Sequence, residues 1–335
     1  MTPPPVRSNP GGHREPGDAP GHVPVLLDRV VALIAPALDR SGSVLIDATL
    51  GLGGHAEAVL ARCPRTRLIG IDRDASAIEY SRSRLVAFAA RVTFVHAVYD
   101  EIPRVLRDHG LDHVDAVLFD LGVSSMQLDV RERGFSYAED APLDMRMDQT
   151  LGRTAADVLN AYPAQDLARV LRDYGEERYA RRIAESIVRA RADRPFEDSS
   201  RLVALVREAI PAPARRHGGH PAKRTFQALR IEVNDELEVL RRALPSAIGA
   251  VGVGGRVVVM SYHSLEDRIT KQVFREHTST RVPPELPFVP DTERPALRSL
   301  TRGAERPSTA ERAANPRAAS ARLRAVERVH PAEAA

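Results

Sequence analysis

Between residues 44 and 120, short apolar runs alternate with stretches of helical periodicity, and no other feature constrains the fold of this chain as strongly. We predict strands over 44–49, 67–72, 91–96 and 114–120, with helices over 54–62 and 75–88. Strands that alternate with helices of this length are typical of βαβ units, which build a parallel sheet through right-handed crossovers. The predicted fold class is therefore α/β, with a doubly wound sheet.

The alternation stops after Asp120 and resumes about a hundred residues later. The intervening pattern is mostly helical, and the α/β pattern returns with a helix over 223–244, an apolar strand over 255–262 and a helix from about 265. We interpret residues 126–221 as a helical substrate-recognition domain inserted into an α/β domain of residues 21–125 and 222–335. One continuous α/β domain with long crossovers is the alternative, which the length of the interruption disfavours. Helices of the insertion are predicted over 154–161, 163–173, 176–192 and 198–209.

The two ends of the chain differ in composition from the rest. Residues 1–20 are rich in Pro and Gly and have no periodicity, so we predict a disordered tail. The segment after Arg294 is rich in Arg, with scattered Ala and Pro. We expect most of this segment to be a solvated, partly disordered end.

Composition excludes several classes of protein. The 335-residue chain has no run of about 18 apolar residues, so we expect no membrane span, and its first 20 residues lack the apolar segment of a secretory signal. A single cysteine, Cys63, excludes a disulfide framework and favours a reducing, cytoplasmic location. The formal net charge is only +3, and an aromatic content of 4% without Trp disfavours a broad base-stacking platform.

A glycine-rich loop follows the first predicted strand and opens the first helix after it. Gly51, Gly53 and Gly54 allow a tight turn and a close approach of the backbone to a ligand. Asp72 ends the next strand, 21 positions after Gly51, where a carboxylate would meet ribose hydroxyls. This context favours a nucleotide-like cofactor over the alternative, a loop of glycines beside an acid that caps a helix.

The acids at the strand ends bear on which cofactor binds. Residues 51–56 also fit the GxGxxG/A pattern of nicotinamide dinucleotides. Asp47 and Asp120, at the ends of the first and fourth strands, would repel a pyrophosphate but suit an ammonium, a sulfonium and ribose hydroxyls. S-adenosylmethionine is therefore the favoured cofactor. A nicotinamide-dependent oxidoreductase and an RNA-binding assembly factor that retains the cofactor fold remain open.

Ten segments along the chain resemble the RsmH/MraW family in sequence and in order. The resemblance covers residues from about 21 to 328 and leaves out the first 20. The segments are GHVPVLL (21–27), DATLGLGGH (47–55), IDRD (71–74), FDLGVSSMQLD (119–129), RGFSY (133–137), PLDMRMD (142–148), YGEERYARRIA (174–184), TFQALRI and VNDEL (within 225–237), SYHSLEDR (261–268) and NPRAASARLR (315–324).

This resemblance implies a class I SAM-dependent methyltransferase fold, Rossmann-like, with an inserted helical domain. It implies methylation of the N4 amine of a cytosine in the decoding region of 16S ribosomal RNA. The implied partner is 16S rRNA in the small ribosomal subunit, with neither DNA nor a membrane, and the chain acts as a monomer or a homodimer. The cofactor contacts that the resemblance implies are Gly53, Gly54, His55, Asp72, Tyr99, Asp120 and Gln127.

Three positions depart from the family pattern. Tyr99 replaces a usual Phe that stacks near the adenine, and Met126 replaces a common Pro in the SSMQLD segment. Ala319 replaces a usual Arg, which weakens the expectation that this position grips RNA.

Residues for catalysis are harder to predict than those for cofactor binding. Many amino methyltransferases carry an Asn/Asp-Pro-Pro-aromatic motif after the fourth strand, whereas this chain has DLGVSS from Asp120. Acceptors for the N–H groups of an amine would stabilise the charge that develops on it. The candidates are Asp120, Ser124 and the turn at 261–263 with His263, for which a structural, hydrogen-bonded histidine is the alternative.

Basic residues that could contact RNA are few and scattered. The best cluster is Arg215, Arg216, Lys223 and Arg224. Arg131, Arg133 and Arg146 are candidates for phosphate contacts or for packing, with ion pairs to Asp144 or Asp148 as the alternative. The HGGH sequence at 217–220 has too few ligands for a metal, so no metal site is predicted.

Overall fold

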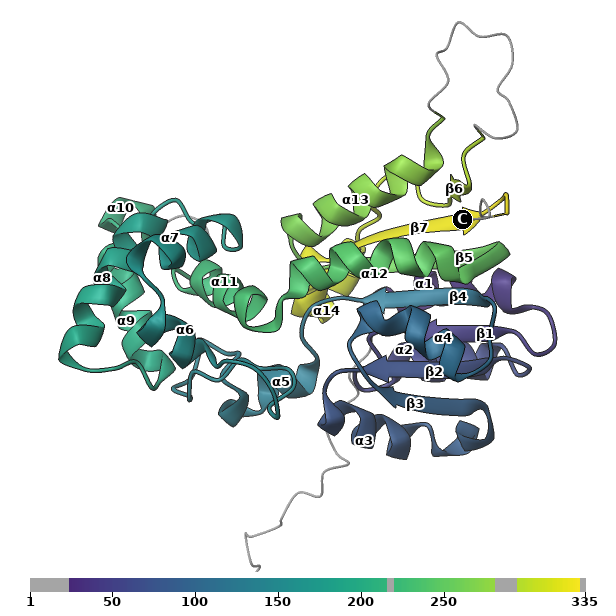
Figure 1. Cartoon of the computed structure of the whole chain (residues 1–335), viewed down its shortest axis with the longest axis horizontal. Coiled ribbons are helices and arrows are strands. Elements are labelled where there is room, and N and C mark those ends of the chain that lie inside the picture. The colour runs from purple at the N-terminus through teal and green to yellow at the C-terminus, as the bar shows by residue number, and fades with distance from the viewer. Residues whose placement is uncertain (1–23, 216–219, 281–293, 332–335) are drawn as a thin grey trace, which may run out of the picture.

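The computed structural model describes residues 24–215, 220–280 and 294–331, and it contains a seven-stranded sheet in the order β3-β2-β1-β4-β5-β7-β6 (Figure 1). The first five strands pair in parallel, and β7 lies antiparallel between β5 and β6. This is the topology of a class I methyltransferase, which confirms the predicted fold class. The strands are β1 (Val44–Asp47), β2 (Arg67–Asp72), β3 (Val92–His96), β4 (Val114–Asp120), β5 (Val251–Ser261), β6 (Leu297–Ser299) and β7 (Arg322–Arg328).

Helices cover both faces of the sheet because its central strands are apolar on both sides. In β1, Ile46 packs into a core with α4, α12 and α13, whereas Leu45 packs into a second core with α1 and α2. Successive strand residues point to opposite faces, so two cores are built from one strand. The helices of this sheet unit are α1 (Leu27–Ile34), α2 (Gly54–Arg62), α3 (Ala75–Arg84), α4 (Ile102–Asp108), α12 (Glu236–Ala250), α13 (Ser264–Thr278) and α14 (Thr309–Ala314).

A separate helical unit stands beside the sheet, with its own apolar core (Figure 1). Helix α7 illustrates its construction, because Leu167, Val170 and Leu171 recur at helical spacing and are all buried. Side chains cap the N-termini of several helices. At the start of α6, for example, Oγ1 of Thr154 accepts a hydrogen bond from the N–H of Asp157. The helices of this unit are α5 (Ser125–Asp129), α6 (Ala155–Ala161), α7 (Ala164–Asp173), α8 (Ala180–Asp193), α9 (Ser199–Ala209), α10 (Ala212–Arg215) and α11 (Lys223–Asn234).

Helix α11 joins the two units. Phe226 and Leu229 belong to the core of the helical unit, whereas Ile231 packs into the core beneath the sheet. Helix α11 therefore contributes to both cores. The single helix expected over 223–244 is wrong, because Asp235 adopts a left-handed conformation with φ 52° and separates α11 from α12.

The C-terminal segment is ordered where it is described, in contrast to the expected solvated end. Strand β7 pairs with β5 from Arg322 to Glu327, and Leu323 and Ala325 are fully buried. In β7, Arg residues alternate with apolar residues, a pattern that is typical of a strand with one charged face and one buried face. Arg322 and Arg324 are compatible with the sheet because both pair with Asp267 of α13. The predicted tail at residues 1–20 lies outside the described residues.

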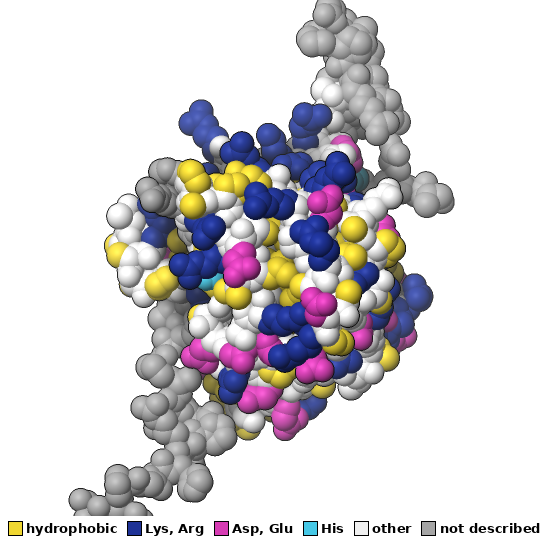
Figure 2. Space-filling model, turned by 90° about the vertical axis from the view of Figure 1, so that its left-hand side faces the viewer, with side chains coloured by type: hydrophobic (Ala, Val, Ile, Leu, Met, Phe, Trp, Pro, Cys, Tyr) yellow, Lys and Arg dark blue, Asp and Glu magenta, His cyan; other side chains and the backbone are white. Residues whose placement is uncertain are grey.

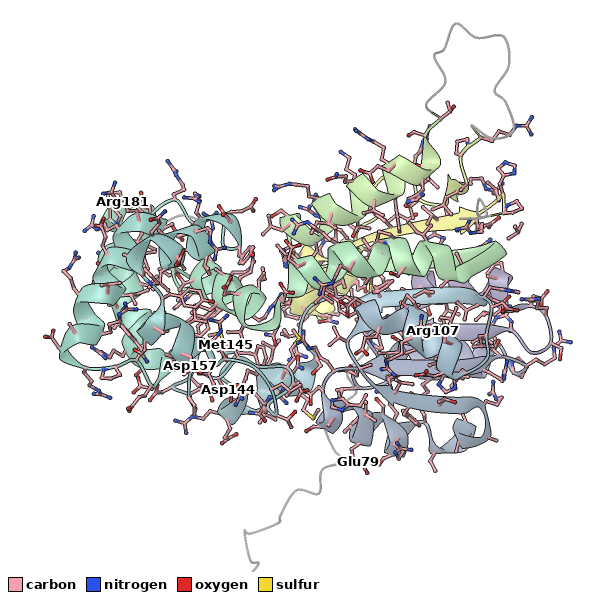
Figure 3. All side chains as sticks on the ribbon, in the orientation of Figure 1. Glu79, Arg107, Asp144, Met145, Asp157 and Arg181 are labelled. Atoms are coloured by element: carbon pink, nitrogen blue, oxygen red, sulfur yellow. The ribbon has the colours of Figure 1, made fainter. Side chains whose placement is uncertain are left out.

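Charge is unevenly distributed on the outer side of the helical unit. In the view onto this side, Lys and Arg side chains gather along the upper part, and Asp and Glu are more frequent in the lower part (Figure 2). An irregular segment with Asp144 and Met145 lies in the part of the helical unit nearest the sheet (Figure 3). Asn234, the last residue of α11, fixes this segment by hydrogen bonds to the backbone of Met145 and Met147.

Candidate functional site

The carboxyl ends of β1, β2, β4 and β5 open onto a cavity of about 680 Å³ between the two units. In parallel sheets, ligands bind in such a crevice outside the carboxyl ends of the strands. The sheet side contributes the glycine loop and several acids. The helical side contributes the aromatic and apolar side chains Phe135, Tyr137, Met147 and Phe226. The acidic groups therefore lie on the sheet side, and α11 adds Lys223 and Arg230 to the helical side.

The glycine loop between β1 and α2 depends on glycine at each predicted position. Gly51 and Gly53 have φ of 51° and 75°, in the left-handed region that glycine adopts without strain. A Cβ on Gly54 would lie 2.5 Å from Cγ of Pro24. Gly51 and Gly54 line the cavity, whereas Gly53 shapes the turn as the N-cap of α2.

Asp72 holds the glycine loop from the end of β2. Its two carboxylate oxygens accept hydrogen bonds from the backbone N–H groups of Gly51, at 2.7 Å, and Asp74, at 2.8 Å. Burial raises the pKa of Asp72 to about 6, although these two hydrogen bonds oppose the rise. Each oxygen keeps a further lone pair, so the carboxylate can also accept from ribose hydroxyls.

Asp120, at the end of β4, is held by three neighbours. Its backbone N–H donates to Oγ1 of Thr49 at 2.6 Å, and its Oδ1 accepts from the hydroxyl of Tyr262 at 2.7 Å. Its Oδ2 lies 3.4 Å from Nδ1 of His55. Burial and the neighbouring Asp120 raise the pKa of Tyr262, so its hydroxyl remains a donor. Asp120 thus presents an oriented acceptor to the cavity.

His55 is a buried side chain that lines the cavity. Its Nε2 lies 3.0 Å from the carbonyl oxygen of Val25, and only an Nε2 that carries hydrogen can bond there. Nδ1 then needs a second proton to bond Asp120. Burial lowers the pKa of His55, but the hydrogen bond and charge of Asp120, together with Asp47, raise it more, and the net shift is upward.

Asp47 lies behind the loop, away from the cavity wall. It is 1% exposed and is absent from the lining of the cavity, so the expected contact with a cofactor ammonium does not follow from its position. Burial raises its pKa to about 7, partly offset by the charge of His55 and the N–H of Thr49. Instead, Asp47 raises the pKa of His55 and accepts a hydrogen bond from the N–H of Thr49 in the turn after β1.

Tyr99 lies where stacking near an adenine is predicted, and it lines the cavity. Its ring packs edge-on against Phe119, with centroids 5.6 Å apart, and its hydroxyl donates to the carbonyl oxygen of Glu236 at 3.3 Å. Burial, reinforced by the charge of Glu236, raises the pKa of Tyr99. The extra hydroxyl relative to Phe therefore has a partner and is accommodated.

Gln127 and Ser124 also line the cavity, but most of their polar atoms have partners within the protein. Oγ of Ser124 accepts from the N–H of Gln127, and Oε1 of Gln127 accepts from the N–H of Ser124. Nε2 of Gln127 donates to Asp74, which also pairs with Arg133 at 2.8 Å. This network joins the helical unit to the sheet unit, and the hydroxyl proton of Ser124 remains available.

His263 caps the start of α13 at the far side of the cavity. Its side chain is 9% exposed, and neither ring nitrogen has a partner of good hydrogen-bond geometry, although Nε2 lies 3.1 Å from Oε1 of Glu266. Burial raises the pKa of Glu266, but His263 and Arg230 lower it more, and the net shift is downward. His263 is therefore a largely buried ring beside an ionised carboxylate.

The cavity fits S-adenosylmethionine by the chemistry of its donors and acceptors. That cofactor carries two cationic groups and a ribose diol, and Asp72 and Asp120 supply acidic acceptors at the ends of β2 and β4, the two strands that flank β1. The glycine loop allows the backbone to approach it closely.

Comparison with known proteins agrees with this geometry. The profile of the MraW methylase family matches residues 19–329. The chain belongs to the MraW methylase family. Among its relatives are proteins named ribosomal RNA small subunit methyltransferase H from Nocardioides sp., 68% identical over 94% of this chain and 99% of that protein, and from Frankia alni, 65% identical over 92% and 96%. The protein of that name from Thermobifida fusca is 61% identical over 92% and 94%.

In this MraW-family methylase the predicted RNA-contacting cluster is dispersed. Lys223 lines the cavity, and Arg224 is exposed beside it. Arg215 lies apart, donating from Nε to the carbonyl oxygen of Ile210, and Arg216 lies outside the described residues. Of this cluster, Lys223 and Arg224 are the residues whose position suits an RNA contact.

The three other candidate arginines pack the helical unit. Arg133 is 5% exposed and pairs with Asp74, not with the expected Asp144 or Asp148, whereas Arg146 does pair with Asp144. Arg131 donates to the backbone carbonyl of Asp140. In this structure the three arginines therefore make contacts within the protein, as the packing alternative expects.

Some cavity residues were not predicted. Tyr262 lies in the predicted turn at 261–263, and its contact with Asp120 follows from the pairing of β4 with β5. Phe226, Tyr137 and Arg317 reach the cavity only through the packing of the two units. Within the described ranges, no cluster of His, Cys, Asp or Glu could hold a metal ion, and no helix is long and apolar enough to cross a bilayer.

Proposed function

We propose that this methylase transfers a methyl group from S-adenosylmethionine to the N4 amine of a cytosine in the decoding region of 16S rRNA. The observation that carries the proposal is the two-walled cavity. An acidic wall built for a cationic nucleoside faces a wall with Tyr137, Phe226 and Lys223, whose aromatic faces and charge suit a nucleotide. The names of the relatives, which act on small-subunit ribosomal RNA, support the same substrate class.

The position of the single cysteine supports methylation of an amine over methylation of a ring carbon. Methylation at C5 of a pyrimidine needs a nucleophile, commonly a thiolate, that adds covalently to the ring. Cys63 is the only cysteine of the chain, and it is buried at the end of α2, outside the lining of the cavity. An exocyclic amine can be methylated by direct displacement, which needs no covalent intermediate with the protein.

Bound S-adenosylmethionine supplies a methyl group already activated on a sulfonium. The chain's own residues must then orient the amine, whose lone pair is delocalised into the ring. Asp120 accepts an N–H of the amine and stabilises the positive charge that develops on nitrogen. The hydroxyl of Tyr262 and the ring of His55 hold this carboxylate in place. We place Ser124, which lines the same wall, in contact with the base.

His263 receives the proton that the methylated nitrogen must lose. Its ring nitrogens have no hydrogen-bond partner among the described residues, and the side chain lines the cavity. The neighbouring Glu266 is ionised because Arg230 lowers its pKa. A carboxylate beside the ring stabilises the imidazolium that forms.

The target base has to leave its stack to reach the cavity. Enzymes that modify a base extrude it into a pocket and stack it on aromatic side chains. Tyr137 and Phe226 meet edge to face, with ring centroids 5.7 Å apart, on the helical wall. We assign this wall to the flipped cytosine, residues 126–221 to substrate recognition, and the protein to the cytoplasm as a monomer or homodimer.

The proposal is tested by incubating the protein with tritiated S-adenosylmethionine and ribosomal particles from cells that lack this methylase. We expect label in the RNA of small subunits, and none in large subunits, DNA or protein. At saturating S-adenosylmethionine, an Asp120→Asn variant should incorporate less than a tenth of the label. Label in another substrate class, or none, would overturn the proposal.

A further inference from the structure

The exposed face of α13 carries a line of cations that no residue of the cofactor site uses. Arg268, Lys271 and Arg275 are exposed and recur at intervals of three and four residues, so they share one side of the helix. Lys271 and Arg275 have no ion-pair or hydrogen-bond partner among the described residues. The line starts at Arg268, five residues after His263, which lines the cavity.

This arrangement is unfavourable for the helix itself. Like charges three or four residues apart repel each other and destabilise a helix. The acids of α13 do not compensate, because Glu266 and Asp267 are buried against His263 and against the arginines of β7. Glu276 accepts a hydrogen bond from Gln272. An external anion would relieve the repulsion along this face.

The line continues across the boundary between the two units. Glu176, in the loop before α8, accepts through its backbone oxygen from Arg224 and through its carboxylate from Arg268 and Ser264. Arg224 therefore lies beside Arg268, although they belong to α11 and α13. Lys223, next to Arg224, lines the cavity. We call Lys223, Arg224, Arg268, Lys271 and Arg275 the basic track.

The basic track occupies one side of the molecule. In Figure 1 the start of α13 points toward the helical unit. From Arg268 to Arg275 the helix rises about 10 Å, which exceeds the spacing of adjacent nucleotides along a strand. The track thus offers several cations in a row that leads away from the cavity.

We propose that the RNA strand flanking the target nucleotide lies along the basic track, with its phosphates on α11 and α13. The inference rests on the proposed function, because it assigns the path of that same substrate. The exposed face of α13 offers cations and no aromatic ring, so the contact is with the sugar-phosphate backbone and is independent of sequence. It positions the strand while the cavity selects the base.

The test uses a double variant, Lys271→Ala with Arg275→Ala, in the full chain. We expect its KM for small-subunit RNA to rise about three- to tenfold, with kcat and the Kd for S-adenosylmethionine unchanged. The slope of log Kd for the RNA against log salt should fall by about 1.4, since each phosphate contact on a single strand contributes about 0.7. The charge-conserving pair Lys271→Arg with Arg275→Lys should restore both values.

Two single variants serve as matched controls. Arg107→Ala on α4 and Arg181→Ala on α8 remove exposed cations away from the track (Figure 3). They should leave KM and the salt slope unchanged. If the double variant behaves like these controls, the face of α13 is a solvated surface and the inference is wrong. RNA binding is measured directly by fluorescence anisotropy, so the track is tested even if the protein methylates a different substrate and the proposed function fails.

Discussion

Replacing Asp72 by Asn should separate cofactor binding from stability. In the folded protein both carboxylate oxygens accept backbone N–H groups, from Gly51 and Asp74. Asn offers a single acceptor oxygen, so one of these N–H groups loses its partner, at a cost of about 1–3 kcal/mol. The same change removes the negative charge of Asp72, which is unfavourable because the carboxylate is buried.

The two effects on stability oppose each other. Burial raises the pKa of Asp72 from its ordinary 3.8 to about 6. This shift lowers the free energy of unfolding only when Asp72 is ionised. The loss is absent below pH 4 and complete above about pH 6, where it amounts to about 3 kcal/mol. Asn avoids this cost, so the free energy of unfolding at pH 7.5 should change by less than about 2 kcal/mol. Cofactor affinity has no such compensation, because the acceptor that faces the ribose loses its charge.

Asp72→Asn should therefore weaken binding of S-adenosylmethionine by 10- to 100-fold, or about 1.4–2.7 kcal/mol. Isothermal titration calorimetry gives the Kd, and urea denaturation gives the stability. Asp108→Asn, which neutralises an exposed acid on α4, is the matched control and should change neither value. A Kd for Asp72→Asn within twofold of the wild type would refute the assignment of the glycine loop to the cofactor.

Three further predictions follow from contacts in and near the cavity. Tyr262→Phe removes the donor to Asp120 and should lower kcat about tenfold in single-turnover methylation, with the cofactor Kd changed by less than threefold. Cofactor affinity should fall about tenfold per pH unit below pH 6, where Asp72 becomes protonated and uncharged, as titrations from pH 5 to 8 would measure. Arg133→Leu leaves the buried Asp74 without its cation and should lower the free energy of unfolding by about 3–5 kcal/mol in urea denaturation.

Each of these predictions has a result that contradicts it. An unchanged kcat for Tyr262→Phe would remove the role given to its hydroxyl. A cofactor affinity that is constant down to pH 5 would mean that the charge of Asp72 is irrelevant to binding. A loss below about 1 kcal/mol for Arg133→Leu would mean that water reaches the pair with Asp74.

The sheet and the cofactor end of the site were predictable because they depend on local patterns. Apolar runs located β1 to β5, and parallel pairing places the ends of neighbouring strands together. Gly54, His55, Asp72, Tyr99, Asp120 and Gln127 accordingly line one cavity. Their contacts with the cofactor remain a prediction.

The remaining features depend on partners that are distant in sequence. In the sequence, β7 resembles a charged, solvated segment. It is compatible with the sheet because Asp267, more than fifty residues earlier, pairs with Arg322 and Arg324. The helical wall of the cavity depends on the packing of α11 against both units, and apolar periodicity alone does not fix that packing. The break at Asp235 was hidden because the apolar spacing continues through it.

The central claim is methylation of an exocyclic cytosine amine, and nucleoside mass spectrometry tests it most directly. Small subunits lacking the modification are incubated with the protein and S-adenosylmethionine carrying a deuterated methyl group, and the RNA is digested to nucleosides. The account predicts labelled N4-methylcytidine as the product. Labelled 5-methylcytidine, or a labelled purine, would contradict it.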